Sequence, residues 1–238
     1  MGSEMCIRDS WGVASFDFDN DGDRDLAIGN GHISGRSSRD YCSTFWRHDL
    51  YTDPDALPWI MRDVYGVTQK GLGKECSWNG FEHNCLLMNV RYEGARKFQN
   101  VAFLFGLASE ADTRNVIECD IDRDGRVDLL TVETSSGKSA TLKVYHNQLP
   151  QTSNWLGVRF DKSLQSDALG ARVTLEGAGR TYVQDILVGD SFNSQREPVA
   201  HFGLGEDRPQ RIRIEWSDGS VSHRLLPECG TYHVIRAK

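Results

Sequence analysis

The sequence predicts an all-β protein built from two consecutive parts, and two observations lead to this fold class. First, an acidic ten-residue pattern, DxDxDGxxDL, occurs at residues 17–26 and again at 120–129, and short apolar runs flank each copy. Second, seven short β-prone runs follow one another from about residue 154 to the C-terminus, separated by turns rich in Gly, Asp and Ser. Short apolar runs between turn signals are typical of strands.

The composition is that of an ordinary soluble protein, and it limits the class of partner. The chain has 238 residues, of which 39% are hydrophobic and 26% charged, and its formal net charge is -7. Nucleic acids and anionic membranes attract clustered Lys and Arg, so neither is an expected partner, and cations are the expected charged ligands. No apolar run approaches the roughly 18 residues of a membrane span.

The first ten residues are not expected to belong to the native chain. Residues 5–10, MCIRDS, look like the translation of a transposon-end sequencing adaptor, so the native sequence is expected to join near Trp11. Under this hypothesis the chain is an N-terminally truncated fragment that has lost its signal peptide. A genuine short N-terminus is the alternative, and long-read sequencing of the locus distinguishes the two.

The acidic pattern predicts two calcium sites. Carboxylates at alternate positions of a tight loop can converge on one hard cation, and the glycine at the sixth position, Gly22 or Gly125, permits the positive φ of a sharp turn. Calcium suits such a loop better than magnesium because its coordination geometry is flexible. Without a cation, the carboxylates repel one another. The predicted ligands are the side chains of Asp17, Asp19, Asp21 and Asp25 with the backbone carbonyl of Asp23, and the side chains of Asp120, Asp122, Asp124 and Asp128 with the carbonyl of Arg126.

Three other interpretations of these loops are weaker. An EF-hand has a bidentate Glu at its twelfth position, which here is Ile28 or Thr131, and continues into a helix, whereas β-prone runs follow both loops. A plain Asp-Gly hairpin turn explains one copy better than two copies with the same carboxylate spacing. General acid and base catalysis needs two carboxyl groups in different environments, and not neighbours that share one cation.

Residues 36–80 lie between the two acidic loops and are predicted to form an insertion without regular structure. Long insertions of this kind are usually functional loops or irregular caps. The aromatic content favours stacking on a glycan or on a partner protein, and packing within the loop is the alternative. The aromatic residues concerned are Tyr41, Trp46, Tyr51, Trp59 and Trp78.

The cysteines leave two interpretations open. Cys42, Cys76 and Cys85 fall in or next to the insertion, where either a disulfide staples the irregular segment or the thiols stay free. Cys119 ends an apolar run and is expected to be a small buried hydrophobe, and Cys229 makes the number odd once Cys6 is set aside. No CxxC pair is present, so zinc is not expected.

An acidic loop between two strands resembles the FG-GAP or VCBS-type repeat, one blade of an integrin-like β-propeller. Residues 11–18, WGVASFDF, and 114–121, RNVIECDI, resemble the opening strand of such a blade, and residues 86–89 and 97–101 loosely resemble later segments. The resemblance implies that residues 11–150 form a partial propeller, the last blades of a larger one, with structural calcium in each acidic loop. Repeats of this kind generally need about three or more neighbours for stability.

The last part of the chain, residues 154–238, is predicted to be a small β-sandwich. Ile212, Ile214 and Trp216 alternate with charged residues, and residues 217–220, SDGS, supply a hairpin turn. Four patches resemble the ASPIC/UnbV domain, which follows VCBS-type repeats in bacterial secreted proteins and in cartilage acidic protein. In order, they are residues 154–158 (NWLGV), 166–173 (SDALGARV), 201–205 (HFGLG) and 214–219 (IEWSDG).

Together the two resemblances imply a secreted, extracellular or periplasmic calcium-binding repeat protein that binds a protein or glycan at a surface. An enzyme is not expected, because no GxSxG motif is present and His201 in HFGLG is predicted to be a packed or surface histidine. The alternative is the C-terminal accessory part of a secreted hydrolase, acting on a glycan or a phosphoester, whose catalytic module lies outside this chain. The full-length gene distinguishes the two, since an upstream hydrolase-like domain favours the enzyme.

Overall fold

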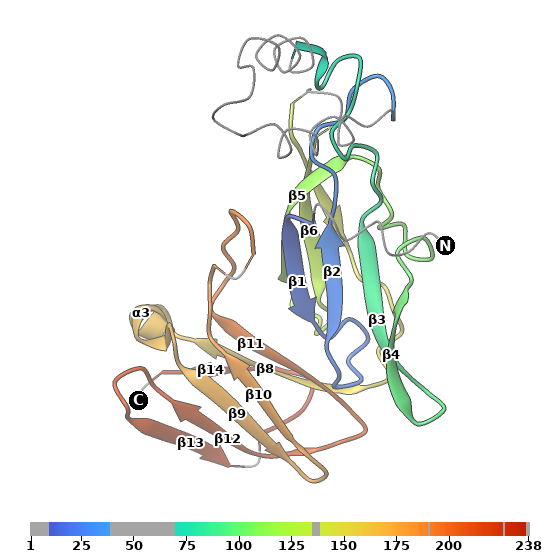
Figure 1. Ribbon diagram of the computed structural model, residues 1–238. Coiled ribbons are helices and arrows are strands. Elements are labelled where there is room, and N and C mark those ends of the chain that lie inside the picture. Colours follow the sequence, from blue (N-terminus) through green and yellow to red (C-terminus); the bar gives the residue numbers. More distant parts are fainter. Residues whose placement is uncertain (1–9, 39–69, 135–138, 190, 226, 237–238) are drawn as a thin grey trace, which may run out of the picture.

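The computed structural model describes residues 10–38, 70–134, 139–189, 191–225 and 227–236. Within these residues the chain forms fourteen strands, arranged in four sheets, with a 3-10 turn and a short helix between β8 and β9 (Figure 1). The prediction of an all-β fold is therefore confirmed. Among the described helices, none has the length and apolar character needed to cross a membrane.

Two antiparallel sheets form the N-terminal part, and each contains one acidic loop between its first two strands. Leu26, for example, pairs with both Ser15 and Leu87 in the first sheet. The order of the first sheet is β1 (Gly12–Phe16), β2 (Asp25–Gly29), β3 (Cys85–Tyr92) and β4 (Ala95–Asn100), and that of the second is β5 (Asp112–Cys119), β6 (Asp128–Thr134) and β7 (Thr141–Tyr145).

The two N-terminal sheets pack together along β1, β2 and β5, and glycines make this approach possible. A Cβ at Gly12 would lie 2.7 Å from the carbonyl oxygen of Arg114, and one at Gly29 would lie 2.9 Å from that of Thr113. The shared core also contains Phe16, Leu86, Val116 and Leu129. The arrangement agrees with two neighbouring blades, while a complete propeller stays a prediction.

The C-terminal part is a sandwich of two sheets. The order of one sheet is β10 (Thr181–Asp185), β9 (Arg172–Gly177), β12 (Pro209–Glu215) and β13 (Val221–Leu225). The order of the other is β11 (Val199–Gly205), β8 (Asn154–Phe160) and β14 (Tyr232–Ile235), with β14 parallel to β8. A 3-10 turn (Lys162–Leu164) and the helix α3 (Gln165–Ala168) connect β8 to β9.

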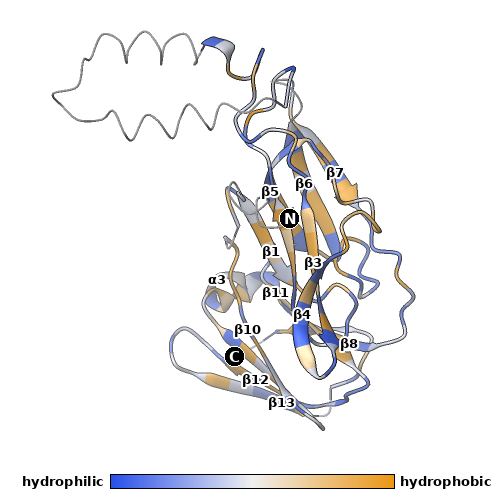
Figure 2. Ribbon diagram, turned by 45° about the vertical axis from the view of Figure 1, so that its right-hand side comes forward, coloured by the Kyte–Doolittle hydropathy of each residue, from blue (hydrophilic) through white to orange (hydrophobic). Residues whose placement is uncertain are grey.

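A single apolar core lies between these two sheets. Leu156 and Phe202 contribute to it from one sheet, and Leu175, Ile212 and Ile214 contribute from the other. Ile212, Ile214 and Trp216 are all buried as predicted, and polar residues alternate with them, as the colouring along the strands in Figure 2 illustrates. Because the two faces of β12 differ in this way, its register is strongly specified.

Two elements were not predicted. The segment 162–168, whose last residues belong to the SDALGARV patch, folds into the 3-10 turn and α3 rather than into a plain turn. The other is strand β7, which is almost entirely exposed although Leu142 and Val144 alternate with polar residues along it.

Most of the predicted insertion, including Cys42 and its aromatic residues other than Trp78, lies outside the described residues. Trp78 packs edge-on against His32, with ring centroids 5.1 Å apart. Among the described cysteines, Cys76, Cys119 and Cys229 are free thiols, and Cys85 is buried.

Candidate metal centre

Both acidic loops are folded by the same hydrogen bonds between carboxylates and backbone amides. In the first loop, the Asp17 carboxylate accepts the backbone N–H groups of Asp21 at 3.1 Å and of Gly22 at 2.7 Å. In the second loop, the Asp120 carboxylate accepts the backbone N–H groups of Asp124 at 3.1 Å and of Gly125 at 2.8 Å. The repeated sequence pattern thus produces one repeated conformation.

The two loops also turn at the same positions. The φ angles of Asn20 and Gly22 are 59° and 89°, and those of Arg123 and Gly125 are 62° and 88°. The positive φ predicted for the sixth-position glycines is therefore confirmed. The fourth position is left-handed as well, and sequence reasoning missed this because Arg rarely adopts such a φ, although Asn does so more often.

The last aspartate of each loop ties the loop to neighbouring backbone. Asp25 accepts the N–H groups of Phe18 at 2.8 Å and of Asn89 at 2.7 Å. In the second loop, Asp128 accepts the backbone N–H groups of Ile121 at 3.0 Å and of Asn147 at 2.8 Å. Because Asn89 and Asn147 donate through their backbone N–H groups, these contacts could not be predicted from residue types in the sequence.

Three predicted ligands of each loop converge. In each trio the carboxylate oxygens lie within 4.8 Å of one another, and the trios are Asp17, Asp19 and Asp25, and Asp120, Asp122 and Asp124. A set of donors made only of oxygen suits a hard cation such as calcium. The residues present therefore fit the predicted ion, whose binding stays a prediction.

Burial makes the first loop electrostatically costly by itself. The pKa of Asp17 is raised to about 8 and that of Asp25 to about 6. Burial is the largest cause of both changes, and the neighbouring carboxylates contribute to them. In the second loop, burial also raises the pKa of Asp120, while a hydrogen bond from Tyr232 opposes the change. A cation among these groups would favour their charged forms.

Two predicted residues of the first loop lie outside its trio. Asp21 is exposed, and its carboxylate accepts the backbone N–H of Asp23 at 2.7 Å. The carboxylate of Asp23 pairs instead with Arg96 at 2.8 Å and with Arg180 at 3.1 Å. This agrees with the prediction that Asp23 would offer only its carbonyl, although that role is not tested.

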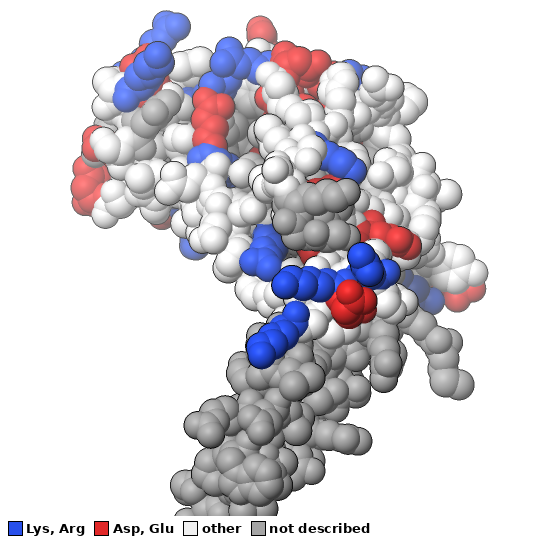
Figure 3. Space-filling model, turned by 90° about the horizontal axis from the view of Figure 1, so that it is seen from above, with Lys and Arg blue, Asp and Glu red and all other residues white. Residues whose placement is uncertain are grey.

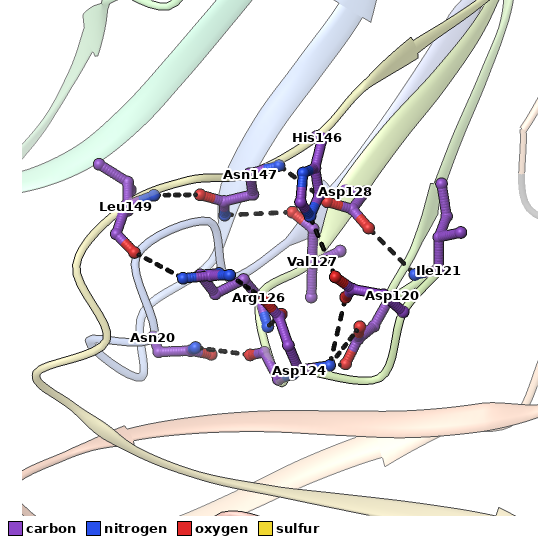
Figure 4. A network of polar contacts seen from close by, with 12 residues as sticks. Asn20, Asp120, Ile121, Asp124, Arg126, Val127, Asp128, His146, Asn147 and Leu149 are labelled. Atoms are coloured by element: carbon purple, nitrogen blue, oxygen red, sulfur yellow. Dashed lines mark hydrogen bonds and ion pairs between the residues drawn. The ribbon is translucent and has the colours of Figure 1, made fainter.

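The second loop differs from the first in two side chains (Figure 4). The guanidinium group of Arg126 folds back and pairs with the carboxylate of Asp124. His146 Nε2 lies 3.2 Å from the carboxylate of Asp122, and these two residues form a further cluster with Asp128. His146 was not predicted as a site residue, because it lies outside the acidic pattern.

The two loops contact each other directly. The Asn20 side chain donates a hydrogen bond to the carbonyl of Gly125 at 2.8 Å (Figure 4). The Asn147 side chain donates to the carbonyl of Phe18 at 2.9 Å. Two buried hydrogen bonds therefore connect the first loop to the second loop and to the segment that follows β7.

The C-terminal sandwich packs on both loops. Tyr232 donates a hydrogen bond to the Asp120 carboxylate at 2.7 Å. A Cβ at Gly203 would overlap the Asp17 carboxylate, and a Cβ at Gly125 would overlap the ring of Trp155. Trp155 and Gly203 belong to the NWLGV and HFGLG patches, so part of each patch contacts an acidic loop.

His201, also in HFGLG, is a packed histidine at this junction. Its Nε2 lies 2.9 Å from Asn20 Oδ1, and its ring stacks on Trp155 with centroids 5.5 Å apart. Burial lowers the pKa of His201 to about 4, so the ring is neutral at pH 7. The Asn20 oxygen can only accept a hydrogen bond, and the proton of the neutral ring therefore resides on Nε2.

A second contact region joins the sandwich to the N-terminal sheets. The loop between β10 and β11 rises beside β1 (Figure 1), and the Asn115 side chain donates to the carbonyl of Phe192 at 3.0 Å. Arg196 in this loop pairs with Glu118 on β5 at 3.0 Å, and both side chains are largely buried. The sandwich is thus joined to the N-terminal sheets at a second place, apart from the acidic loops.

Comparison with known proteins agrees with this architecture. The family model for ASPIC and UnbV matches residues 161–238. Cartilage acidic protein 1 of Xenopus tropicalis is 28% identical in an alignment of 229 residues that covers 91% of this chain and 35% of that protein. The mouse and human proteins of the same name are each 33% identical, over 45% and 44% of this chain respectively, and over 17% and 16% of their own lengths.

The chain thus spans about a third of the length of the first of these relatives and less of the other two. The ASPIC and UnbV match falls on the C-terminal sandwich, whereas the similarity to the Xenopus protein covers 91% of the chain and so extends into the N-terminal sheets. The resemblance predicted from the sequence, to proteins of the cartilage acidic protein type that end in an ASPIC/UnbV domain, is therefore confirmed.

Proposed function

We propose that this chain is a calcium-stabilised module of an extracellular binding protein, with one calcium ion in each acidic loop. The observation that supports this best is the identical folding of two loops that lie 103 positions apart in the sequence. Both keep several carboxylates close together, partly buried and oriented by backbone N–H groups. A cation that offsets the repulsion among the carboxylates would stabilise such an arrangement.

The calcium ions would have a structural role. Asp17, Asp19 and Asp25 would hold the first ion, and Asp120, Asp122 and Asp124 the second. A bound ion would neutralise the buried charge and fix loops that contact each other and the sandwich. No redox or catalytic chemistry is required of it.

The extracellular setting is supported by the relatives and by the expected affinity. The name of cartilage acidic protein 1 refers to an extracellular tissue. Calcium modules in extracellular proteins bind with dissociation constants of about 10⁻⁴ to 10⁻³ M, which suits loops with exposed ligands such as Asp122. The protein or glycan that the module binds is not specified by these loops.

Calorimetric titration with calcium and with magnesium tests the proposal, together with thermal melts in excess chelator. We expect two calcium sites and a calcium-specific rise in melting temperature. At a calcium concentration ten times the dissociation constant, each site adds about 1.4 kcal/mol to the unfolding free energy.

Asp19→Asn and Asp122→Asn should each remove one of these sites. Glu228→Gln, which removes an exposed carboxylate away from both loops, is the matched control and should bind like the parent protein. A folded protein that binds no calcium, or one in which Asp19→Asn and Asp122→Asn change nothing, would refute the proposal.

A further inference from the structure

We propose that a groove between the β3–β4 hairpin and strand β10 binds the sulfate or carboxylate groups of an acidic oligosaccharide. The groove has a volume of about 580 Å³ and passes beside the first acidic loop. The inference rests on the proposed binding function, for which it names a class of ligand. The groups that would recognise the ligand are arginines, not the predicted calcium ligands.

Three guanidinium groups converge on the single carboxylate of Asp23. Arg96 lies 2.8 Å and Arg180 3.1 Å from Oδ1, and Arg91 lies 3.7 Å from Oδ2. The side chain of Asp23 is only 6% exposed, whereas those of Arg91 and Arg96 are 67% and 56% exposed. Because one carboxylate offsets one positive charge, the cluster of three arginines keeps two positive charges in excess. Each guanidinium group has five N–H donors in all.

The hairpin arranges its positive charges in a way that costs stability. Arg91 and Arg96 are directly opposite in the pairing of β3 with β4, and Lys97 follows opposite Val90. Like charges in directly opposed positions destabilise an antiparallel sheet. Asp23 relieves part of this repulsion, and an anionic ligand would relieve the rest. Sheet stability alone therefore does not explain why Arg91 and Arg96 lie opposite each other.

The walls of the groove suit a sugar that has acidic groups. Phe98 on β4 lines the groove and is 53% exposed, so one flat apolar ring is open to a ligand. Arg180 is held over the ring of Tyr182, with its guanidinium carbon 4.4 Å from the ring centroid. Planar guanidinium groups bind oxyanions in a bidentate manner, and aromatic rings offer a surface for stacking.

The basic groove is a local feature of an acidic protein. The whole chain has 34 acidic and 27 Lys and Arg residues. On the face shown in Figure 3, blue and red side chains are interspersed rather than separated. Such a protein would repel an extended polyanion such as nucleic acid at most positions, while a short oligosaccharide could reach the arginines alone.

Calcium in the first loop would strengthen the site electrostatically. The residues that line the groove include three arginines, Arg24, Arg96 and Arg180, and two aspartates, Asp17 and Asp23, so their formal charges sum to one net positive charge. A calcium ion in the first loop would add two positive charges beside the groove. Oligosaccharide binding should therefore be tighter with calcium than with chelator.

The test is calorimetric titration of the full chain, in saturating calcium, with a heparin-type hexasaccharide that has both sulfate and carboxylate groups. We expect Arg91→Ala and Arg96→Ala each to weaken binding by about tenfold, since charge-assisted hydrogen bonds are lost. Asp23→Asn keeps the backbone carbonyl and frees the arginines, so it should bind the hexasaccharide severalfold more tightly. Arg224→Ala, which removes an exposed arginine on β13, is the matched control.

Two further titrants identify the source of the anion. Inorganic sulfate and a hexaglutamate peptide should both bind more weakly than the hexasaccharide, because neither can stack on Phe98. Tighter binding of the peptide would overturn the proposal in favour of an acidic protein partner. Equal loss in Arg224→Ala, or no hexasaccharide binding by a chain that still binds calcium, would overturn it while the proposed calcium function stands.

Discussion

Gly203 is the residue at which the C-terminal sandwich approaches the first acidic loop most closely. A Cβ at this position would overlap the carboxylate of Asp17 and would lie 2.5 Å from the Cα of Asn20. The φ angle of Gly203 is not positive, so only the close approach demands glycine. The glycine of a motif that looks like an ordinary turn in the sequence is thus required by a part of the chain more than 180 residues away.

Gly203→Ala should therefore destabilise the protein by about 2 kcal/mol, the usual effect of overpacking a filled site. It should also weaken calcium binding to the first loop, because the added methyl group displaces Asp17. Chemical denaturation and calcium titration measure the two effects. Gly189→Ala is the control, since Gly189 is exposed and a Cβ there would meet its nearest atom only at 3.9 Å. If both variants behave alike, the contact has no energetic importance.

The buried Asp17 predicts an unusual pH dependence in the absence of calcium. Its pKa is about 8 in the folded chain against 3.8 for an aspartate exposed to solvent, so between these two pH values the folded state binds more protons than the unfolded state. Its contribution to stability is complete below pH 3.8 and is lost as the pH rises toward 8. His201, whose pKa falls from 6.5 to about 4, opposes this only below pH 6.5.

In chelator, the melting temperature should thus decrease between pH 6.5 and 8, where Asp17 dominates. In saturating calcium the decrease should disappear, because the ion favours the charged carboxylate. Thermal melts across this range provide the measurement, and Asp17→Asn should remove the slope in chelator. A melting temperature in chelator that is constant or rises over the range would contradict the assignment.

At the scale of elements, the two acidic loops share one backbone but differ in what occupies their carboxylates. In the second loop Arg126 pairs with Asp124, so a cation would have to compete with a guanidinium group. At the corresponding position of the first loop is Asp23, whose side chain points to arginines outside the loop. We therefore expect the second loop to bind calcium more weakly.

Arg126→Gln should strengthen calcium binding by the second loop roughly fivefold, the upper range for a partly exposed ion pair. The substitution keeps the backbone carbonyl of residue 126. Asp19→Asn in the same chain removes calcium binding by the first loop, so that only the second site is measured. Arg123→Gln, which changes an exposed arginine of the same loop, is the control. An unchanged affinity in Arg126→Gln would show that the ion pair does not compete with calcium.

Most strands could be predicted from the sequence, because apolar runs and turn residues act locally. The alternation of Ile212, Ile214 and Trp216 correctly gave the buried face of β12. Strand β7 was not predicted although Leu142 and Val144 alternate with polar residues, and α3 was missed because a four-residue helix has too few positions to show a period. The acidic trios were also local, whereas His146 and the contacts of Asn89 and Asn147 depend on how distant strands pair.

At the scale of the whole molecule, the acidic loops lie at the junction between the N-terminal sheets and the sandwich. Asn20 connects the first loop, the second loop and the sandwich, since its side chain donates a hydrogen bond to Gly125 in the second loop and accepts one from His201 on β11. Tyr232 extends the connection from β14 to Asp120. Ordering the loops with calcium should consequently order the facing ends of β11 and β14 as well.

Asn20→Gly isolates this coupling, because glycine accepts the φ of 59° while both side-chain hydrogen bonds are lost. We expect calcium affinity to change little, stability to fall by roughly 2 kcal/mol for two buried hydrogen bonds, and calcium to lose its protective effect on β11. Hydrogen exchange with and without calcium measures the protection. Strand β13, at the far edge of the sandwich, provides an internal reference.

Asn193→Gly is the matched variant, since Asn193 is also left-handed, with a φ of 46°, but is exposed. It should keep calcium-dependent protection of β11, because no acidic loop contacts its side chain through a described hydrogen bond. If Asn20→Gly retains the same protection, the hydrogen bonds of Asn20 do not couple the loops to β11, and the other contacts between the two parts carry the coupling. If protection is lost only in Asn20→Gly, calcium stabilises the junction as well as each loop.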